Sequence, residues 1–185
     1  MIAPIRFEFR AAKFVAAVTY LAQACPGMTK LKLCKLLYFA DKEHLVRFGR
    51  PITGDHYYKL EHGPVPTRGL DLLKGQGYAP DVALLEKYIA VKGMTIHPKQ
   101  APERKVFSRS DLGVLDSVCR KYGRMTAAQL RTLSHRERAW VEAAENGPMD
   151  FGLFFGDAPD AFQVKRLVEA EQESRSVILP FHASR

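Results

Sequence analysis

Several features that identify familiar classes of protein are missing from this chain of 185 residues. A membrane-spanning helix needs about eighteen apolar residues in a row, and no apolar run in the chain approaches this length, so no membrane span is predicted. The opening residues lack a basic segment followed by an apolar core, so no secretory signal is predicted. The cysteines, Cys25, Cys34 and Cys119, are odd in number and widely spaced, which is typical of reduced thiols. We therefore expect a cytoplasmic protein.

The usual signatures of catalysis and of cofactor binding are missing too. The chain has no Cys-x-x-Cys or His-x-x-x-His spacing, and its six histidines are scattered. It has no Gly-x-Ser-x-Gly elbow and no Gly-x-x-x-x-Gly-Lys phosphate loop. His56 and His62 would share one strand face, but six residues of strand span about 20 Å, too far for one metal ion. No catalytic residue, metal or cofactor is predicted.

Positive charge is in excess, because 28 Lys and Arg against 20 Asp and Glu give a net charge of +8. Residues 1–50 carry most of this excess, with nine basic and three acidic side chains. A basic face attracts nucleic acid or an acidic protein. The same pattern fits a solubilising helix surface, since the basic residues are spaced along helices rather than gathered in a block.

Helical spacing dominates the pattern of apolar residues. It predicts a helix from Glu8 to Ala24 and a second from the cap residue Thr29 to Gly49, where Pro51 prevents continuation. In the C-terminal half, Ser, Thr or Asp followed three residues later by Asp, Glu or Gln predicts further helix starts. The helices expected there lie near 108–122, 127–133, 135–145 and 161–175, and a partly flexible tail is expected at 176–185.

Between these two halves the spacing changes to the alternation of β-strands. Strands are predicted near 56–61, 88–91 and 94–97. The first is expected to end at a turn, Gly63–Pro66, before a short helix capped by Thr67, and the other two flank Lys92-Gly93 as a hairpin. Lys105–Phe107 is expected to add a further edge. The fold class is therefore α+β and mainly α-helical, with six to eight helices and a small antiparallel sheet in one domain, residues 1–175.

A few polar and aromatic side chains need partners in such a fold. Asp41 interrupts an apolar row, and because an unpaired buried carboxylate is costly, it should accept hydrogen bonds from a Tyr, His or backbone group of the nearby sheet. Glu61 and His62 are expected to brace the strand and its turn. Trp140 is expected to anchor the core, although an exposed Trp beside an arginine would instead be a contact point for a partner.

Three stretches together resemble the Panacea domain, the family of SocA-like antitoxins and GepA-like phage-associated proteins. They are Tyr38-Phe-Ala-Asp41 before a helix end, Gly49-Arg-Pro51-Ile-Thr-Gly54-Asp, and Gly63-Pro64-Val-Pro66. Leu133-Ser-His135-Arg-Glu-Arg-Ala-Trp140 is similar to a C-terminal segment of the family, with Arg138 where proline is more usual. The resemblance spans roughly residues 10–145. It implies structural motif roles for Tyr38, Asp41, Gly49, Pro51, Gly54, Gly63, His135 and Trp140.

The resemblance implies an antitoxin of a two-gene, prophage-associated toxin–antitoxin module, whose partner is a cognate toxin protein. Some members of the family are proposed to mask the toxin. SocA itself resembles a proteolytic adaptor, which delivers its toxin to the ClpXP protease. Neither role requires a catalytic group, so the resemblance implies that the chain is not an enzyme.

We hypothesise that the basic first quarter and the turn from Tyr57 to Arg68 form the toxin-facing surface. A stiff Gly-Pro-Val-Pro turn loses little entropy on binding, and the lysines would speed capture of an acidic toxin. The residues expected to take part are Lys30, Lys32, Lys35, Lys42, Arg47, Tyr57, Glu61, His62, Pro64, Val65 and Arg68.

Two other functions are compatible with the sequence. A nucleic-acid-binding regulator of its own operon fits the charge, although no clear helix-turn-helix pattern supports DNA binding. An enzyme acting on a nucleotide or on a modified toxin product would need Asp41, Glu61, His62 and Arg68 to converge around a pocket.

Overall fold

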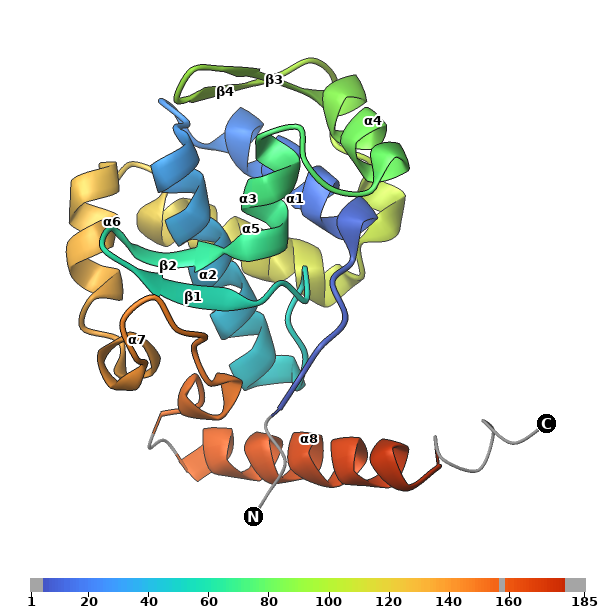
Figure 1. The fold of residues 1–185 in the computed structure, drawn as a ribbon, viewed down its shortest axis with the longest axis vertical. Coiled ribbons are helices and arrows are strands. Elements are labelled where there is room, and N and C mark those ends of the chain that lie inside the picture. The colour runs from blue at the N-terminus through green and yellow to red at the C-terminus, as the bar shows by residue number, and fades with distance from the viewer. Residues whose placement is uncertain (1–4, 157–158, 179–185) are drawn as a thin grey trace.

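The computed structural model of the chain describes residues 5–156 and 159–178. Eight α-helices and two β-hairpins occur in this part (Figure 1), which confirms the predicted α+β, mainly helical class. The small antiparallel sheet is in fact two separate two-stranded sheets. Of the predicted tail, 176–185, the first three residues belong to the last helix, and the part from residue 179 onward lies outside the described residues.

Helix α2, Lys30–Phe48, lies at the centre and has the predicted bounds. The side chain of its cap residue Thr29 accepts a hydrogen bond from the backbone N–H of Lys32 at 3.2 Å. Gly49 ends the helix with a φ of 73°, a left-handed conformation that favours glycine. The helix packs against α1, α5, α6, α8 and the first hairpin, so its side chains reach most of the other elements.

Helix α1, Ala11–Ala24, begins later than the predicted start at Glu8. The backbone before it is extended instead, because the N–H of Arg10 donates to the carbonyl of Thr53 at 2.8 Å. A Cβ built on Gly54 would lie 2.0 Å from the carbonyl oxygen of Glu8. This close approach of two backbones, which the sequence pattern cannot show, replaces the first helical turn.

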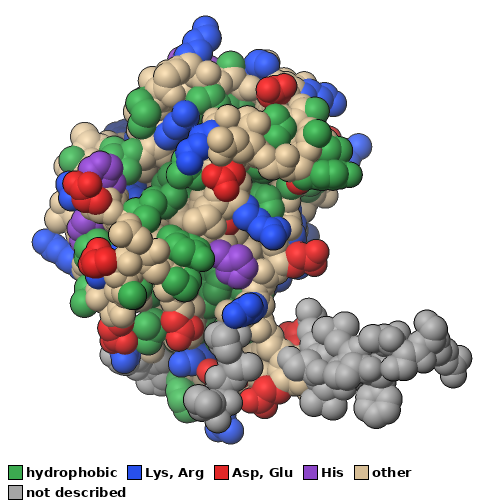
Figure 2. All heavy atoms as spheres, viewed as in Figure 1, with side chains coloured by type: hydrophobic (Ala, Val, Ile, Leu, Met, Phe, Trp, Pro, Cys, Tyr) green, Lys and Arg blue, Asp and Glu red, His purple; other side chains and the backbone are tan. Residues whose placement is uncertain are grey.

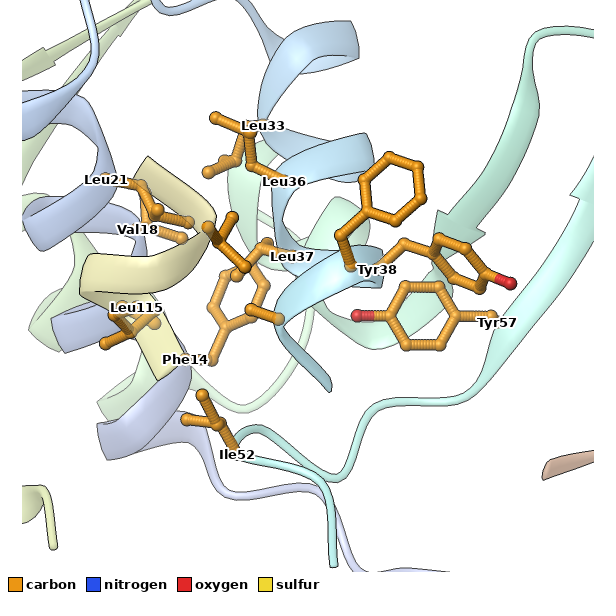
Figure 3. Close-up of a cluster of buried hydrophobic side chains, with 14 of the residues drawn as sticks. Phe14, Val18, Leu21, Leu33, Leu36, Leu37, Tyr38, Ile52, Tyr57 and Leu115 are labelled. Atoms are coloured by element: carbon orange, nitrogen blue, oxygen red, sulfur yellow. The ribbon is translucent and has the colours of Figure 1, made fainter. Parts of the chain in front are cut away.

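The hydrophobic core lies between α1, α2 and α5, Arg109–Tyr122. Figure 3 shows aliphatic and aromatic side chains from these helices converging on α2, with Tyr57 entering from the first hairpin. Fully burying one such side chain contributes about 1.5–3 kcal/mol. The core therefore holds the central helix on several sides at once. Its largest buried members include Phe14, Leu21, Leu33, Leu36, Leu37, Tyr38, Leu45, Ile52 and Tyr57.

The first hairpin joins β1, Tyr57–Leu60, to β2, Gly63–Pro66. The prediction that Gly63–Pro66 is a turn is therefore wrong, because the turn is Glu61-His62 and Gly63, with a φ of 93°, begins the second strand. Two prolines are tolerated there since β2 is an edge strand that pairs only with β1.

Two helices follow this hairpin, and the sequence predicted only the first of them. Helix α3, Thr67–Leu73, includes Thr67 as its first residue rather than being capped by it. Helix α4, Ala79–Tyr88, is the one that was not predicted. It buries only Leu85, and its sequence lacks the wide apolar stripe by which a helix is recognised.

The second hairpin, β3 (Ile89–Lys92) and β4 (Thr95–Pro98), lies one residue later than predicted. It sits beside α4 at the opposite end of the molecule from α8 (Figure 1). The expected edge strand at Lys105–Phe107 is wrong, because Arg104–Val106 form a single 3₁₀ turn.

In the C-terminal half, α5 and α6, Ala127–Ser134, begin with the predicted capping boxes. Helix α7, Arg138–Glu142, is shorter than the predicted 135–145, because Ser134 belongs to α6 and its hydroxyl donates to the carbonyl of Arg131 at 2.9 Å.

A 3₁₀ turn, Phe151–Leu153, leads to helix α8, Pro159–Ile178, which extends past both predicted ends, 161 and 175. It lies along one edge of the molecule (Figure 1) and contacts α2. None of the described helices is both long enough and apolar enough to cross a lipid bilayer.

Candidate functional site

Asp41 is a fully buried carboxylate in the middle of α2. It accepts hydrogen bonds from the backbone N–H groups of Ile52 and Thr53, both at 2.8 Å, and from the hydroxyls of Thr53 and Tyr57. Burial raises the pKa of the carboxyl, and these hydrogen bonds oppose the rise. The expected tyrosine donor of the sheet, Tyr57, is confirmed, whereas the backbone donors belong to the loop after α2 rather than to the sheet. Asp41 therefore holds the loop after α2 in place.

A second buried carboxylate, Asp55, performs a similar task at the start of α3. It accepts hydrogen bonds from the backbone N–H groups of Gly69 at 2.7 Å and Arg68 at 3.1 Å. Burial raises the pKa of Asp55 to about 7, against these two hydrogen bonds. The sequence analysis missed this residue, although an Asp directly after the Gly54 turn is a common way to satisfy free backbone donors.

A third acidic centre, Asp111, is surrounded by two cations, Lys13 and Arg50, and by the imidazole of His44. Its carboxylate contacts Lys13 of α1 at 2.5 Å, and Arg50 and His44 at 3.0 Å each. Burial opposes ionisation, but the close contacts with His44 and Lys13 and the charge of Arg50 hold the pKa of Asp111 well below its usual range. The sequence indicated only a helix-capping role here, so this ion cluster was not foreseen.

The four residues of the enzyme hypothesis do not share one environment. Asp41 is enclosed by its hydrogen-bond donors, Glu61 and His62 are exposed at the hairpin turn, and Arg68 is exposed on α3. Among residues 5–156 and 159–178, no group of three or more His, Cys, Asp or Glu side chains is placed to hold a metal ion.

Five of the residues expected to contact a partner are buried: Lys32, Lys35, Tyr57, Pro64 and Val65. The ammonium of Lys35 donates to the carbonyl of Pro64 at 2.7 Å, and burial lowers the pKa of Lys35 to about 8. Lys32 donates to two backbone carbonyls. These lysines stabilise the fold and are not surface charges, which corrects the expectation that both would face a partner.

The other expected contact residues are at least partly exposed but do not form one patch. Glu61 and His62 lie at the turn of the first hairpin, Arg68 lies on α3, and Lys30 lies at the start of α2. Lys42 and Arg47 lie further along α2. Figure 2 shows basic and acidic side chains scattered over the visible face rather than gathered in one block. The structure therefore separates these residues into several groups.

Lys42 and Arg47 lie on the wall of a groove of about 400 Å³ between α2 and the C-terminal end of α5. We call it the α2–α5 groove. At its floor, the rings of Phe39 and Tyr122 stack with centroids 4.6 Å apart and planes at 24°. The groove is lined by Phe39, Lys42, Glu43, Val46, Arg47, Lys121, Tyr122 and Glu137.

Ion pairs line the rim of the α2–α5 groove. Glu43 accepts hydrogen bonds from Arg47 and Lys121, each at 3.0 Å, and Lys42 pairs with Glu137 at the start of α7. The side chains of Arg47 and Lys121 are each more than half exposed, at 53% and 55%. Such exposed pairs are weak, so an incoming carboxylate can compete for the cations. The sequence analysis found Lys42 and Arg47 but not the residues of α5.

Beside this groove, Trp140 of α7 stacks on His135 with ring centroids 3.9 Å apart. The ammonium of Lys59 lies 4.6 Å from the centre of the Trp140 ring and forms an ion pair with Glu145 at 2.8 Å. Trp140 is half-buried and packs against the core, which agrees with the predicted anchoring role. It ties α7 to the first hairpin.

Comparison with known proteins gives one match. A family model described as antitoxin SocA-like, Panacea domain, matches residues 33–141. This range contains α2 from Leu33 onward, the first hairpin, the three buried aspartates Asp41, Asp55 and Asp111, and all residues of the α2–α5 groove. Searches of curated proteins and of solved structures found no match.

Proposed function

The chain belongs to the family of SocA-like antitoxins with a Panacea domain, and from this membership we propose that it binds and neutralises a cognate toxin protein through the α2–α5 groove. The antitoxin role follows from the family, whose match covers more than half of the chain. The location follows from the groove itself, because it combines a stacked aromatic floor with exposed cations. Recognition by contact needs no group that makes or breaks a covalent bond.

The chemistry of the groove favours a toxin segment that presents an aromatic or aliphatic side chain between acidic residues. Phe39 is buried and Tyr122 is partly exposed, so the Tyr122 ring, backed by Phe39, offers the apolar surface that suits such an anchor side chain. Arg47 and Lys121 share one acidic partner, Glu43, so the pair has positive charge to spare for an acidic ligand. The net charge of +8 adds a long-range attraction that speeds association with an acidic protein.

A captured toxin can be neutralised in two ways, by masking or by delivery to a ClpXP-type protease. We propose that groove binding precedes both. Co-expression of the chain with the product of an adjacent small reading frame separates them. A stable complex at constant toxin level supports masking, whereas toxin that disappears only when the protease is present supports delivery.

The location is tested by removing charge from the groove without touching the core. In the double variant Arg47→Gln with Lys121→Gln, association with the toxin should slow by about three- to tenfold at low salt, and the difference should shrink as salt screens the charges. A matched control is Lys92→Gln with Arg109→Gln, which removes two exposed cations that do not line the groove.

Thermal unfolding of both variants checks that the fold is intact. Equal association rates for the two double variants would remove the groove from the proposal. Loss of toxin protection in cells with unchanged binding of purified proteins would point instead to a step after capture.

A further inference from the structure

Cys25 and Cys119 lie next to each other although 94 positions separate them in the chain. Their sulfur atoms are 3.4 Å apart, with the Cys119 thiol in hydrogen-bond contact with Cys25. Cys25 follows the last residue of α1, and Cys119 lies in the last turns of α5. The wide sequence spacing predicted three separate thiols, and the tertiary structure instead makes two of them a pair.

The pair is positioned by contacts that do not involve sulfur. The ammonium of Lys32 donates to the carbonyls of Pro26 at 2.8 Å and Gly123 at 2.7 Å, which joins the turn after α1 to the end of α5. A Cβ built on Gly123 would lie 2.9 Å from the sulfur of Cys25. The absence of a side chain at this glycine therefore leaves the space that Cys25 occupies.

The two sulfurs differ in acidity in the way that a reactive pair requires. The hydrogen bond between the two sulfurs lowers the pKa of Cys25, burial opposes this, and the charge of Lys32 adds to the lowering. The same hydrogen bond and burial raise the pKa of Cys119. In contrast, burial raises the pKa of Cys34 to about 11, so that thiol is expected to be inert.

The pair also lies within reach of a small oxidant. Cys25 borders a surface depression of about 450 Å³ but is itself only 1% exposed, whereas Cys119 on α5 is half-buried. Cys34, near the start of α2, is also buried, and it does not line this depression.

We propose that Cys25 and Cys119 form a reversible oxidation site, at which hydrogen peroxide converts the dithiol to an intramolecular disulfide. The sulfurs need to approach to about 2.05 Å, which is a small movement from hydrogen-bond contact. This inference goes beyond the proposed toxin binding and does not rest on it.

The reaction balances in two steps. A thiolate of the pair attacks one peroxide oxygen, the O–O bond breaks, and the departing hydroxide takes up the proton that the thiol released, giving water and a sulfenic acid. The second sulfur then attacks the sulfenic sulfur, an S–S bond forms, the S–O bond breaks, and the second thiol proton leaves with the hydroxyl as water. The two thiols lose two electrons and two protons, which the peroxide takes up.

The disulfide would tie the end of α1 to α5 and close a long loop of the unfolded chain. Because the cross-link restricts the unfolded state, the oxidised protein should unfold at a higher temperature. Reduction by a dithiol such as dithiothreitol should return the original Tm.

The test treats the full folded chain with hydrogen peroxide, blocks the remaining thiols by alkylation and maps the peptides without reduction. We expect one Cys25–Cys119 cross-link within the chain, a free Cys34, and a rise in Tm on the order of 5 °C that dithiothreitol reverses. The control variant Cys34→Ser should form the same cross-link, whereas Cys119→Ser should form none.

Wild-type peptide mapping is decisive even if a serine variant at Cys25 or Cys119 fails to fold. A cross-link that involves Cys34, a link that appears only after denaturation, or oxidation of the pair to sulfinic acids without an S–S bond would each overturn the proposal.

Discussion

The ammonium of Lys35 donates a hydrogen bond to the carbonyl oxygen of Pro64 across 2.7 Å, and both residues are buried. The bond joins the central helix α2 to the second strand of the first hairpin. A Cβ built on Gly63 would lie 3.0 Å from Cε of Lys35 and 2.8 Å from Oγ of Ser134, so the glycine before Pro64 leaves room for this contact. The Gly63–Pro66 stretch, expected to present a stiff turn to a partner, instead receives a buried lysine.

The buried position of Lys35 predicts a particular pH dependence of stability. Its pKa falls from 10.5 to about 8 on folding, so between these values the unfolded chain binds more protons than the folded one. Stability from this group therefore increases as pH rises from about 8 to about 10.5, and it is lost as pH falls through 8.

Chemical denaturation of the wild type and of Lys35→Met at several pH values measures this effect. Between pH 8 and pH 10.5, the free energy of unfolding of the wild type should increase relative to that of Lys35→Met by up to about 3 kcal/mol. A difference that does not change with pH would show that the ammonium is not desolvated as the structure indicates.

Asp55 predicts the opposite dependence at lower pH. Its pKa rises from 3.8 to about 7 on folding, so the folded chain binds more protons between these values. Its contribution is fully present below pH 3.8 and is lost as pH rises through 7. Relative to Asp55→Asn, the wild type should lose up to about 4 kcal/mol of stability between pH 4 and pH 7, measured by urea unfolding. The control is Asp71→Asn, which makes the same change from carboxylate to amide at an exposed position.

Replacing either of two helical glycines by alanine should change the stability of the protein, but in opposite directions. A Cβ on Gly69 would lie 2.1 Å from the ring of Phe14, so Gly69→Ala should cost roughly 2 kcal/mol or more through overpacking. A Cβ on Gly113 would meet no atom within 4 Å, so Gly113→Ala should stabilise by about 0.5–1 kcal/mol through helix propensity. Thermal unfolding of both variants checks the pair, and a loss of stability at Gly113 would contradict it.

Removing the charge of Asp111 should leave two cations, Lys13 and Arg50, without their common partner. Asp111→Asn is expected to cost about 3–5 kcal/mol near pH 7, because Lys13, His44 and Arg50 converge on this carboxylate.

The pKa of Asp111 lies below its unfolded value, so its contribution is present above about pH 4 and is lost as pH falls. The stability gap between the wild type and Asp111→Asn should therefore narrow in acid. An unfolding series from pH 7 to pH 3 measures this, and a constant gap would mean that the ion cluster is not the cause.

Sequence patterns located elements best where local chemistry alone sets an element's ends. The bounds of α2 follow from the Thr29 cap and the left-handed Gly49, and the starts of α5 and α6 follow from capping boxes. Patterns failed where a distant segment replaces a local bond. The first turn of α1 is lost to Thr53, and the proposed cap Ser134 bonds within α6 instead.

The candidate site was only partly visible for the same reason. Lys42 and Arg47 could be recognised as surface cations of an amphipathic helix, but Lys121 and Tyr122 enter the α2–α5 groove from a segment far along the chain. In the sequence, Lys32 and Lys35 look like exposed cations. In the structure they are buried, and their ammonium groups donate to the carbonyls of Pro26, Gly123 and Pro64, which come from other segments of the chain.

By itself the sequence determined the helical class, the caps of the main helices, the acceptor role of Asp41 and the resemblance to the antitoxin family. These depend on residue type and short spacing, which act over a few positions. Only the tertiary structure decided which lysines are structural, which aromatic rings form the groove floor, and that Cys25 meets Cys119. Each of those depends on the packing of helices that are distant in sequence, where backbone carbonyls and buried space are set by the whole fold.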